Sequence, residues 1–140
     1  MLLQKEPGTP SLEFGMGSVK ENVAILGASD RPERFAYQAD KLLQSYGHKT
    51  FLINPKLDEV EGHKCQHGLC EIGSTQIDTV ALYVNPKILA GQIDDIIKIK
   101  PKRVIFNPGT EDILLEKKLK SAGIEPVRGC TLVMLNSGTF

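Results

Sequence analysis

Short apolar runs alternate with amphipathic stretches along most of this chain. Runs rich in aliphatic residues cover 22–26, 49–53, 78–84, 102–106 and 124–127. The first four end at a glycine or at an Asn-Pro pair. Proline cannot donate to a sheet ladder and restricts the residue before it, so these ends are typical of strand termini. The runs therefore predict the strands of a sheet.

Apolar positions at helical spacing fill several of the intervals between these runs. They predict helices over 32–46, 88–97 and 113–119, the last ending near Gly123, and a terminal helical turn over 130–135. The stretch 56–75 is rich in glycine and is predicted to be a loop with short structure. Pro126 in the last run favours the edge of the sheet.

Strands that alternate with helices predict a parallel sheet with right-handed crossovers. The expected fold class is α/β, a Rossmann-like three-layer domain with a mainly parallel sheet of five to six strands. Residues 1–20 contain several prolines and glycines and no regular spacing of apolar residues. They are therefore expected to form a loose leader before a single domain over 21–140.

The composition narrows the classes of partner. The chain has 140 residues, of which 41% are hydrophobic and 24% charged, as is typical of one globular domain. Lys+Arg and Asp+Glu both number 17, so no global field favours nucleic acid or an anionic membrane. No apolar run approaches the roughly 20 residues that span a bilayer. The three cysteines are odd in number and favour reduced thiols, and we expect a cytoplasmic protein.

The loop after the first strand, Gly27-Ala28-Ser29, is the strongest candidate for ligand chemistry. Ligands of parallel sheets bind beyond the carboxyl ends of the strands. Small residues let the backbone approach a phosphate, while the following helix offers unpaired N–H groups and the positive end of its dipole. Ser29 adds a hydroxyl, and Arg31 or Arg34 could supply a charged fork. The alternative is a tight strand-to-helix turn that binds nothing.

This loop differs from the usual dinucleotide fingerprint, G-x-G-x-x-G, because only Gly27 is present. After the second strand, NAD-binding proteins place an acidic residue against the ribose hydroxyl. Here the sequence is Asn54-Pro55-Lys56, and a cation suits a phosphorylated ribose. The residues thus favour NADP or coenzyme A over NAD, although Lys56 taken singly could be a solvated loop lysine.

Several motifs occur in a recognisable order: Gly27-Ala28-Ser29-x-x-Pro32-x-Arg34, Asn54-Pro55, Tyr83-Val84-Asn85-Pro86, Asn107-Pro108-Gly109-Thr110 and Cys130-Thr-Leu-Val. Together they resemble the small single-domain CoA-binding proteins, a family related to the CoA-binding domain of succinyl-CoA synthetase. The resemblance covers 21–140. It implies a Rossmann-like fold and coenzyme A as ligand, and it implies no settled reaction.

The resemblance also implies a role for each motif. Gly27, Ala28 and Ser29 would face the pyrophosphate, with Arg34 nearby. Asn54, Pro55 and Lys56 would border the 3′-phosphate end of the adenosine. Val84, Asn85 and Pro86 would wall the adenine or ribose, while Asn107, Pro108 and Gly109 would line the path toward pantetheine. The segment 62–67 departs from the family's plainer sequence, which leaves the second half of the pocket open.

Two other groups of residues contain side chains that can bind metals or react with thiols. His63, Cys65, His67 and Cys70 are zinc-ligating types, but they crowd one loop without C-x-x-C pairing, so solvated histidines and partly buried thiols are the favoured interpretation. Cys130 could exchange disulfides with coenzyme A, although its apolar neighbours favour burial. No metal site and no catalytic residue is therefore expected.

The leading function is binding of coenzyme A or an acyl-CoA by a non-catalytic carrier, sensor or partner subunit. An NADP-dependent oxidoreductase is the second hypothesis, although 140 residues leave little room for a substrate beside the nicotinamide. The third is a protein-interaction module with a vestigial pocket. A homodimer is compatible with the sequence, because small α/β domains commonly dimerise.

Overall fold

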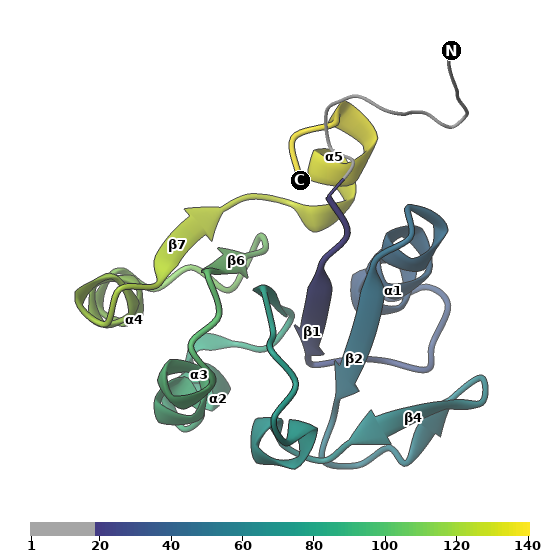
Figure 1. Ribbon diagram of the computed structural model, residues 1–140, viewed down its shortest axis with the longest axis horizontal. Coiled ribbons are helices and arrows are strands. Elements are labelled where there is room, and N and C mark those ends of the chain that lie inside the picture. Colours follow the sequence, from purple (N-terminus) through teal and green to yellow (C-terminus); the bar gives the residue numbers. More distant parts are fainter. Residues whose placement is uncertain (1–18) are drawn as a thin grey trace.

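The computed structural model describes residues 19–140, so the expected leader 1–20 lies almost wholly outside the described residues. One seven-stranded sheet runs through the molecule in the order β3-β4-β2-β1-β5-β6-β7 (Figure 1). Its strands are β1 (Asn22–Leu26), β2 (Lys49–Ile53), β3 (Glu59–Val60), β4 (His63–Gln66), β5 (Thr79–Leu82), β6 (Arg103–Phe106) and β7 (Glu125–Arg128). All neighbouring pairs are parallel except the short antiparallel pair β3 and β4.

The Rossmann-like α/β class is confirmed, while the expected number of strands is too low. Both additional strands come from 56–75, which the sequence predicted to be a loop with short secondary-structure elements. The hairpin turn between β3 and β4 is Glu61-Gly62, and both residues have positive φ, at 50° and 84°. The hairpin extends the sheet because β4 pairs with the outer edge of β2, from Leu52↔Cys65 to Ile53↔Gln66.

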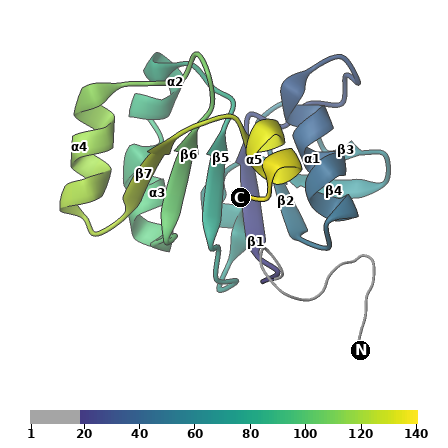
Figure 2. The ribbon, with the colours of Figure 1, turned by 90° about the horizontal axis from the view of Figure 1, so that it is seen from above.

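Five α-helices cover the two faces of the sheet: α1 (Phe35–Ser45), α2 (Pro86–Ala90), α3 (Ile93–Ile99), α4 (Ile113–Ser121) and α5 (Thr131–Ser137). A 3₁₀ turn, η1, spans Leu69–Ile72. Figure 2 shows α1 and α5 together in front of the sheet, with α2, α3 and α4 on the other side. The predicted helix over 88–97 is therefore two helices, which break at Gly91 and Gln92, because glycine is a poor residue for a helix interior.

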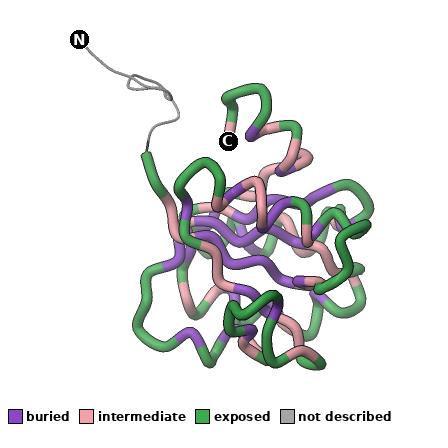
Figure 3. The backbone as a smooth tube through the Cα atoms, turned by 90° about the vertical axis from the view of Figure 1, so that its right-hand side faces the viewer, coloured by how far each residue is buried: buried purple, intermediate pink, exposed green. Residues whose placement is uncertain are grey.

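Alternate residues of the central strands feed two separate cores. Val23 and Ile25 of β1 pack with α1 and α5, whereas Ala24 and Leu26 pack with the layer that contains α2, α3 and α4. This alternation is the period of a strand that is buried on both faces, and it confirms the three-layer arrangement. Figure 3 shows the buried strands in the interior, with exposed residues concentrated in the loops and on outer helix surfaces.

Local chemistry fixes the ends of several elements. Asp112 caps α4 by accepting from the Leu115 N–H at 3.0 Å, and the Glu116 carboxylate accepts from the Asp112 N–H at 3.1 Å. These reciprocal bonds satisfy two donors that the helix itself cannot pair. β7 lies at the sheet edge, as Pro126 predicted. Within residues 19–140, no helix is long and apolar enough to cross a membrane.

Candidate functional site

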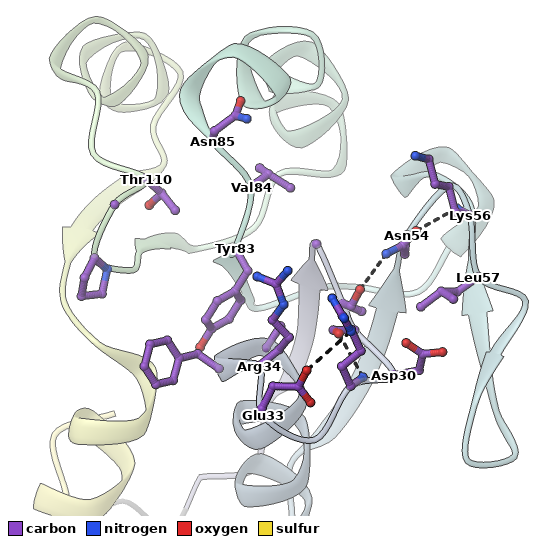
Figure 4. A pocket seen from close by; sticks show the side chains of 18 residues that line it. Asp30, Glu33, Arg34, Asn54, Lys56, Leu57, Tyr83, Val84, Asn85 and Thr110 are labelled. Atoms are coloured by element: carbon purple, nitrogen blue, oxygen red, sulfur yellow. Dashed lines mark hydrogen bonds and ion pairs between the residues drawn. The ribbon is translucent and has the colours of Figure 1, made fainter.

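A cavity of about 870 Å³ opens at the carboxyl ends of the central strands (Figure 4). The loops that follow β1, β2, β5 and β6 meet there because these strands are parallel. β1 lies between β2 and β5. The chain first extends the sheet on one side of β1, through β2, and later extends it on the other side, through β5. Such a reversal of strand order opens a crevice between loops, which is the usual ligand position in this class of sheet.

Packing explains the glycine that follows β1. Gly27 has a φ of 95°, and a Cβ atom at this position would lie 2.7 Å from the Tyr83 carbonyl oxygen. The N–H groups of Gly27 and Ala28 both donate to the Ile53 carbonyl, at 3.0 and 3.1 Å. The loop is thus hydrogen-bonded to the end of β2 and packs closely against the residue that follows β5. Gly27 is required by this close approach, whether or not a ligand is bound.

The start of α1 gives the cavity its anion-binding character. Arg34 is the N-cap residue and its side chain makes no capping bond, and no acidic residue lies in the first turn. The N–H groups of this turn therefore keep the partial positive charge of the helix end. Figure 4 shows the Arg34 guanidinium directed into the cavity. Arg31 pairs with Glu33 at 3.5 Å, whereas Arg34 has no ion pair within residues 19–140.

Asn54 ties two of the cavity loops together. Its Nδ2 donates to the Ala28 carbonyl at 2.7 Å, and its Oδ1 accepts from the Lys56 N–H at 2.7 Å (Figure 4). With both ends of its amide engaged, Asn54 holds its own loop against the loop after β1. Lys56 lines the same cavity, and its ammonium group has no ion pair in the described part of the chain.

The structure brings together most of the residues predicted for the site. Those that line the cavity are Gly27, Ala28, Ser29, Arg34, Asn54, Lys56, Val84, Asn85, Pro108 and Gly109. Pro55 and Pro86 do not line it. Sequence reasoning omitted Asp30, Glu33, Phe35, Ala36, Leu57, Tyr83 and Thr110 from the predicted site. Tyr83 and Thr110 stand within the quoted motifs, so position alone could have found them.

Asn107 has a different place from the one predicted, because it does not line the cavity. Its side chain is 2% exposed, and its Nδ2 donates to the Leu82 carbonyl at 3.1 Å. Its Oδ1 accepts from the N–H of Thr131 at 2.8 Å and from the hydroxyl of Thr131 at 3.0 Å. A buried amide with these bonds joins the ends of β5 and β6 to the start of α5. Asn107 therefore supports the loops that form the cavity wall, from a buried position outside the cavity.

The cluster of histidines and cysteines is dispersed in the structure. Cys65 is buried and its pKa is raised by that burial, whereas Cys70 is exposed. His67 pairs with Asp58 at 2.8 Å. Among residues 19–140, no group of three or more His, Cys, Asp or Glu side chains is placed to hold a metal ion. Cys130 is the half-buried N-cap residue of α5.

The fold is a Rossmann-like α/β fold with a cavity at the carboxyl edge of its sheet. Residues 21–136 match the family described as the CoA binding domain, and the chain belongs to that family.

Two relatives and one solved structure are similar to parts of this chain. The uncharacterized protein YneT of Bacillus subtilis is 31% identical over 78 residues, which are 56% of this chain and 57% of that protein. An ADP-forming acetate–CoA ligase of Methanocaldococcus jannaschii is 34% identical over 76 residues, or 54% of this chain and 10% of the ligase. A crystal structure of an uncharacterized protein is similar with a TM-score of 0.79 and 43% identity, over 87% of this chain and 99% of that one.

Proposed function

We propose that this protein binds coenzyme A or an acyl-CoA in the cavity and acts as a binding, carrier or sensor protein without a reaction of its own. The observation that carries the proposal is the meeting of the uncapped start of α1, Arg34 and Lys56 at one cavity. These groups suit a ligand with phosphates at two separated points. Membership of the CoA binding domain family supports coenzyme A as that ligand.

In this proposal the pyrophosphate lies against the loop 27–29 and the first turn of α1, where N–H groups and Arg34 balance its charge. Lys56 pairs with the 3′-phosphate of the adenosine, beside Asn54. Val84 and Asn85 border the adenine and ribose. The pantetheine arm, which is uncharged, follows Pro108 and Gly109.

Calorimetric titration with coenzyme A, dephospho-CoA, NADP and NAD tests the proposal. Coenzyme A should bind most tightly, and dephospho-CoA, which lacks only the 3′-phosphate, should bind roughly 10- to 150-fold more weakly, as expected for the loss of a charge-assisted hydrogen bond. Lys56→Ala should remove most of this difference. Lys64→Ala is the matched control, because Lys64 is an exposed lysine of β4 outside the cavity.

The other outcomes separate the competing functions. Preference for NADP would favour an oxidoreductase, and binding of none of the four nucleotides would favour an interaction module. If Lys56→Ala weakens coenzyme A and dephospho-CoA equally, Lys56 does not pair with the 3′-phosphate. Substitution of Gly27 is not a suitable test, because a side chain there collides with the backbone of Tyr83 and would report folding.

A further inference from the structure

The cavity has a charged side and an uncharged side. Its acidic and basic side chains all come from the loops after β1 and β2: Asp30, Arg31, Glu33, Arg34 and Lys56. The loops after β5 and β6 contribute only uncharged residues, among them Tyr83, Val84 and Thr110 (Figure 4). A ligand that fills the cavity therefore carries its charge at one end and an uncharged part at the other.

Tyr83 is the unusual member of the uncharged side. Its ring lines the cavity, yet its hydroxyl oxygen is buried and has no hydrogen-bond partner within residues 19–140. Buried polar groups are nearly always paired, and an unpaired one lowers stability unless it serves another purpose. The hydroxyl of the neighbouring Thr131 donates to Asn107; it lies close enough to lower the pKa of Tyr83, but it makes no hydrogen bond of regular geometry with the Tyr83 hydroxyl.

The hydroxyl remains a proton donor under all ordinary conditions. Burial raises the pKa of Tyr83 to about 12, and this effect outweighs the opposing influence of Thr131. Because the neutral hydroxyl can donate, an acceptor such as a carbonyl oxygen can pair with it, and no charge is needed on that acceptor. Amide and thioester carbonyls are acceptors of this kind and occur in uncharged chains.

We infer that Tyr83 selects the uncharged arm of the ligand by donating a hydrogen bond from its hydroxyl to an amide or thioester carbonyl oxygen. The inference rests on the proposed function, in which this arm is the pantetheine chain of coenzyme A. Because the hydroxyl is shielded from solvent, ligand entry has to shift the Tyr83 ring. Tyr83 thereby distinguishes a complete ligand from a nucleotide that lacks the arm.

Tyr83→Phe tests this inference with two probes, coenzyme A and adenosine 3′,5′-bisphosphate, which keeps the adenosine, its 3′-phosphate and one 5′-phosphate and lacks the arm. The variant should bind coenzyme A roughly two- to tenfold more weakly, as for one neutral hydrogen bond, and bind the bisphosphate as the wild type does. Its melting temperature without ligand should be equal or higher, because an unpaired hydroxyl is removed. Tyr46→Phe is the control, since Tyr46 lies outside the cavity.

Three results would overturn the inference. Unchanged affinity for coenzyme A would show that the hydroxyl makes no bond with the arm. Equal losses for both probes would show that it supports the shape of the whole cavity. A lower melting temperature would show that it has a structural partner. If the wild type binds neither probe, the proposed function is refuted, and the inference with it. This outcome is seen before any variant is compared.

Discussion

Replacement of Asn107 by alanine should destabilise the protein strongly, although Asn107 itself does not line the cavity. Asn107 is 2% exposed and uses both ends of its amide. The substitution removes the bonds to the Leu82 carbonyl and to the N–H and hydroxyl of Thr131. These three partners then remain in the interior without a replacement from the protein.

The expected loss follows from these groups. Each buried donor or acceptor left unpaired costs about 1–3 kcal/mol, and partial rearrangement lowers the sum, so the free energy of unfolding should fall by about 3–5 kcal/mol. For a domain of this size, roughly 3–5 °C accompany each kcal/mol, which gives a melting temperature lower by roughly 10–20 °C.

Urea unfolding followed by circular dichroism measures this loss. Asn85→Ala is the matched control, because Asn85 accepts from the Ile88 N–H at 2.9 Å as the exposed N-cap of α2 and should cost only about 1 kcal/mol. A loss below about 1 kcal/mol for Asn107→Ala would refute the view that this amide joins the strand ends to α5. So would a large loss of ligand affinity with unchanged stability, which would restore Asn107 to the cavity.

Three further predictions concern other parts of the chain. Gly27→Ala should lower the free energy of unfolding by at least about 2 kcal/mol in urea unfolding, because its Cβ would lie 2.7 Å from a backbone oxygen. Gly109→Ala, at a glycine with a similar φ and nothing within 4 Å of the added Cβ, should cost about 1 kcal/mol. Equal losses for the two variants would contradict this explanation. Burial lowers the pKa of His48, so the folded state binds its proton less well than the unfolded state. The contribution of neutral His48 to the free energy of unfolding is full above about pH 6.5 and is lost as the pH falls toward the lowered pKa. His48→Gln should therefore make the free energy of unfolding less dependent on pH between about pH 7 and 5. An aromatic disulfide reagent should modify Cys70 rapidly and Cys65 only on unfolding, because Cys65 is buried and its thiol pKa is raised; fast reaction of both in the native state would exclude that burial.

The central strands and the loops at their ends could be predicted because local sequence determines them. Residues 22–26 and 49–53 are strands with the predicted bounds, since apolar runs that stop at Gly27 or at Asn54-Pro55 have few alternatives. Parallel pairing then brings the loop after β1 and the loop after β2 to the same edge. Lys56 and Arg34 could therefore be placed at one cavity from the order of the elements alone.

Features that depend on partners far along the chain were not predictable. The hairpin of β3 and β4 carries few apolar residues, and its turn, Glu61-Gly62, lacks the Asn-Gly or Asp-Gly pair that usually signals such a turn. It forms because β2 offers an open edge. Asn107 likewise turns inward because Thr131, 24 residues later, supplies its donors. Neither partner is visible in the local pattern.

The central claim is that coenzyme A occupies the cavity at the carboxyl edge of the sheet. Titration of isotope-labelled protein with coenzyme A, followed by amide NMR, tests it most directly. If coenzyme A binds there, the amide signals of Ser29, Lys56 and Gly109, which line the cavity, should shift together and saturate, while those of Tyr46 and Gly123, outside it, should stay in place. No shift, or shifts confined to the opposite edge, would contradict it.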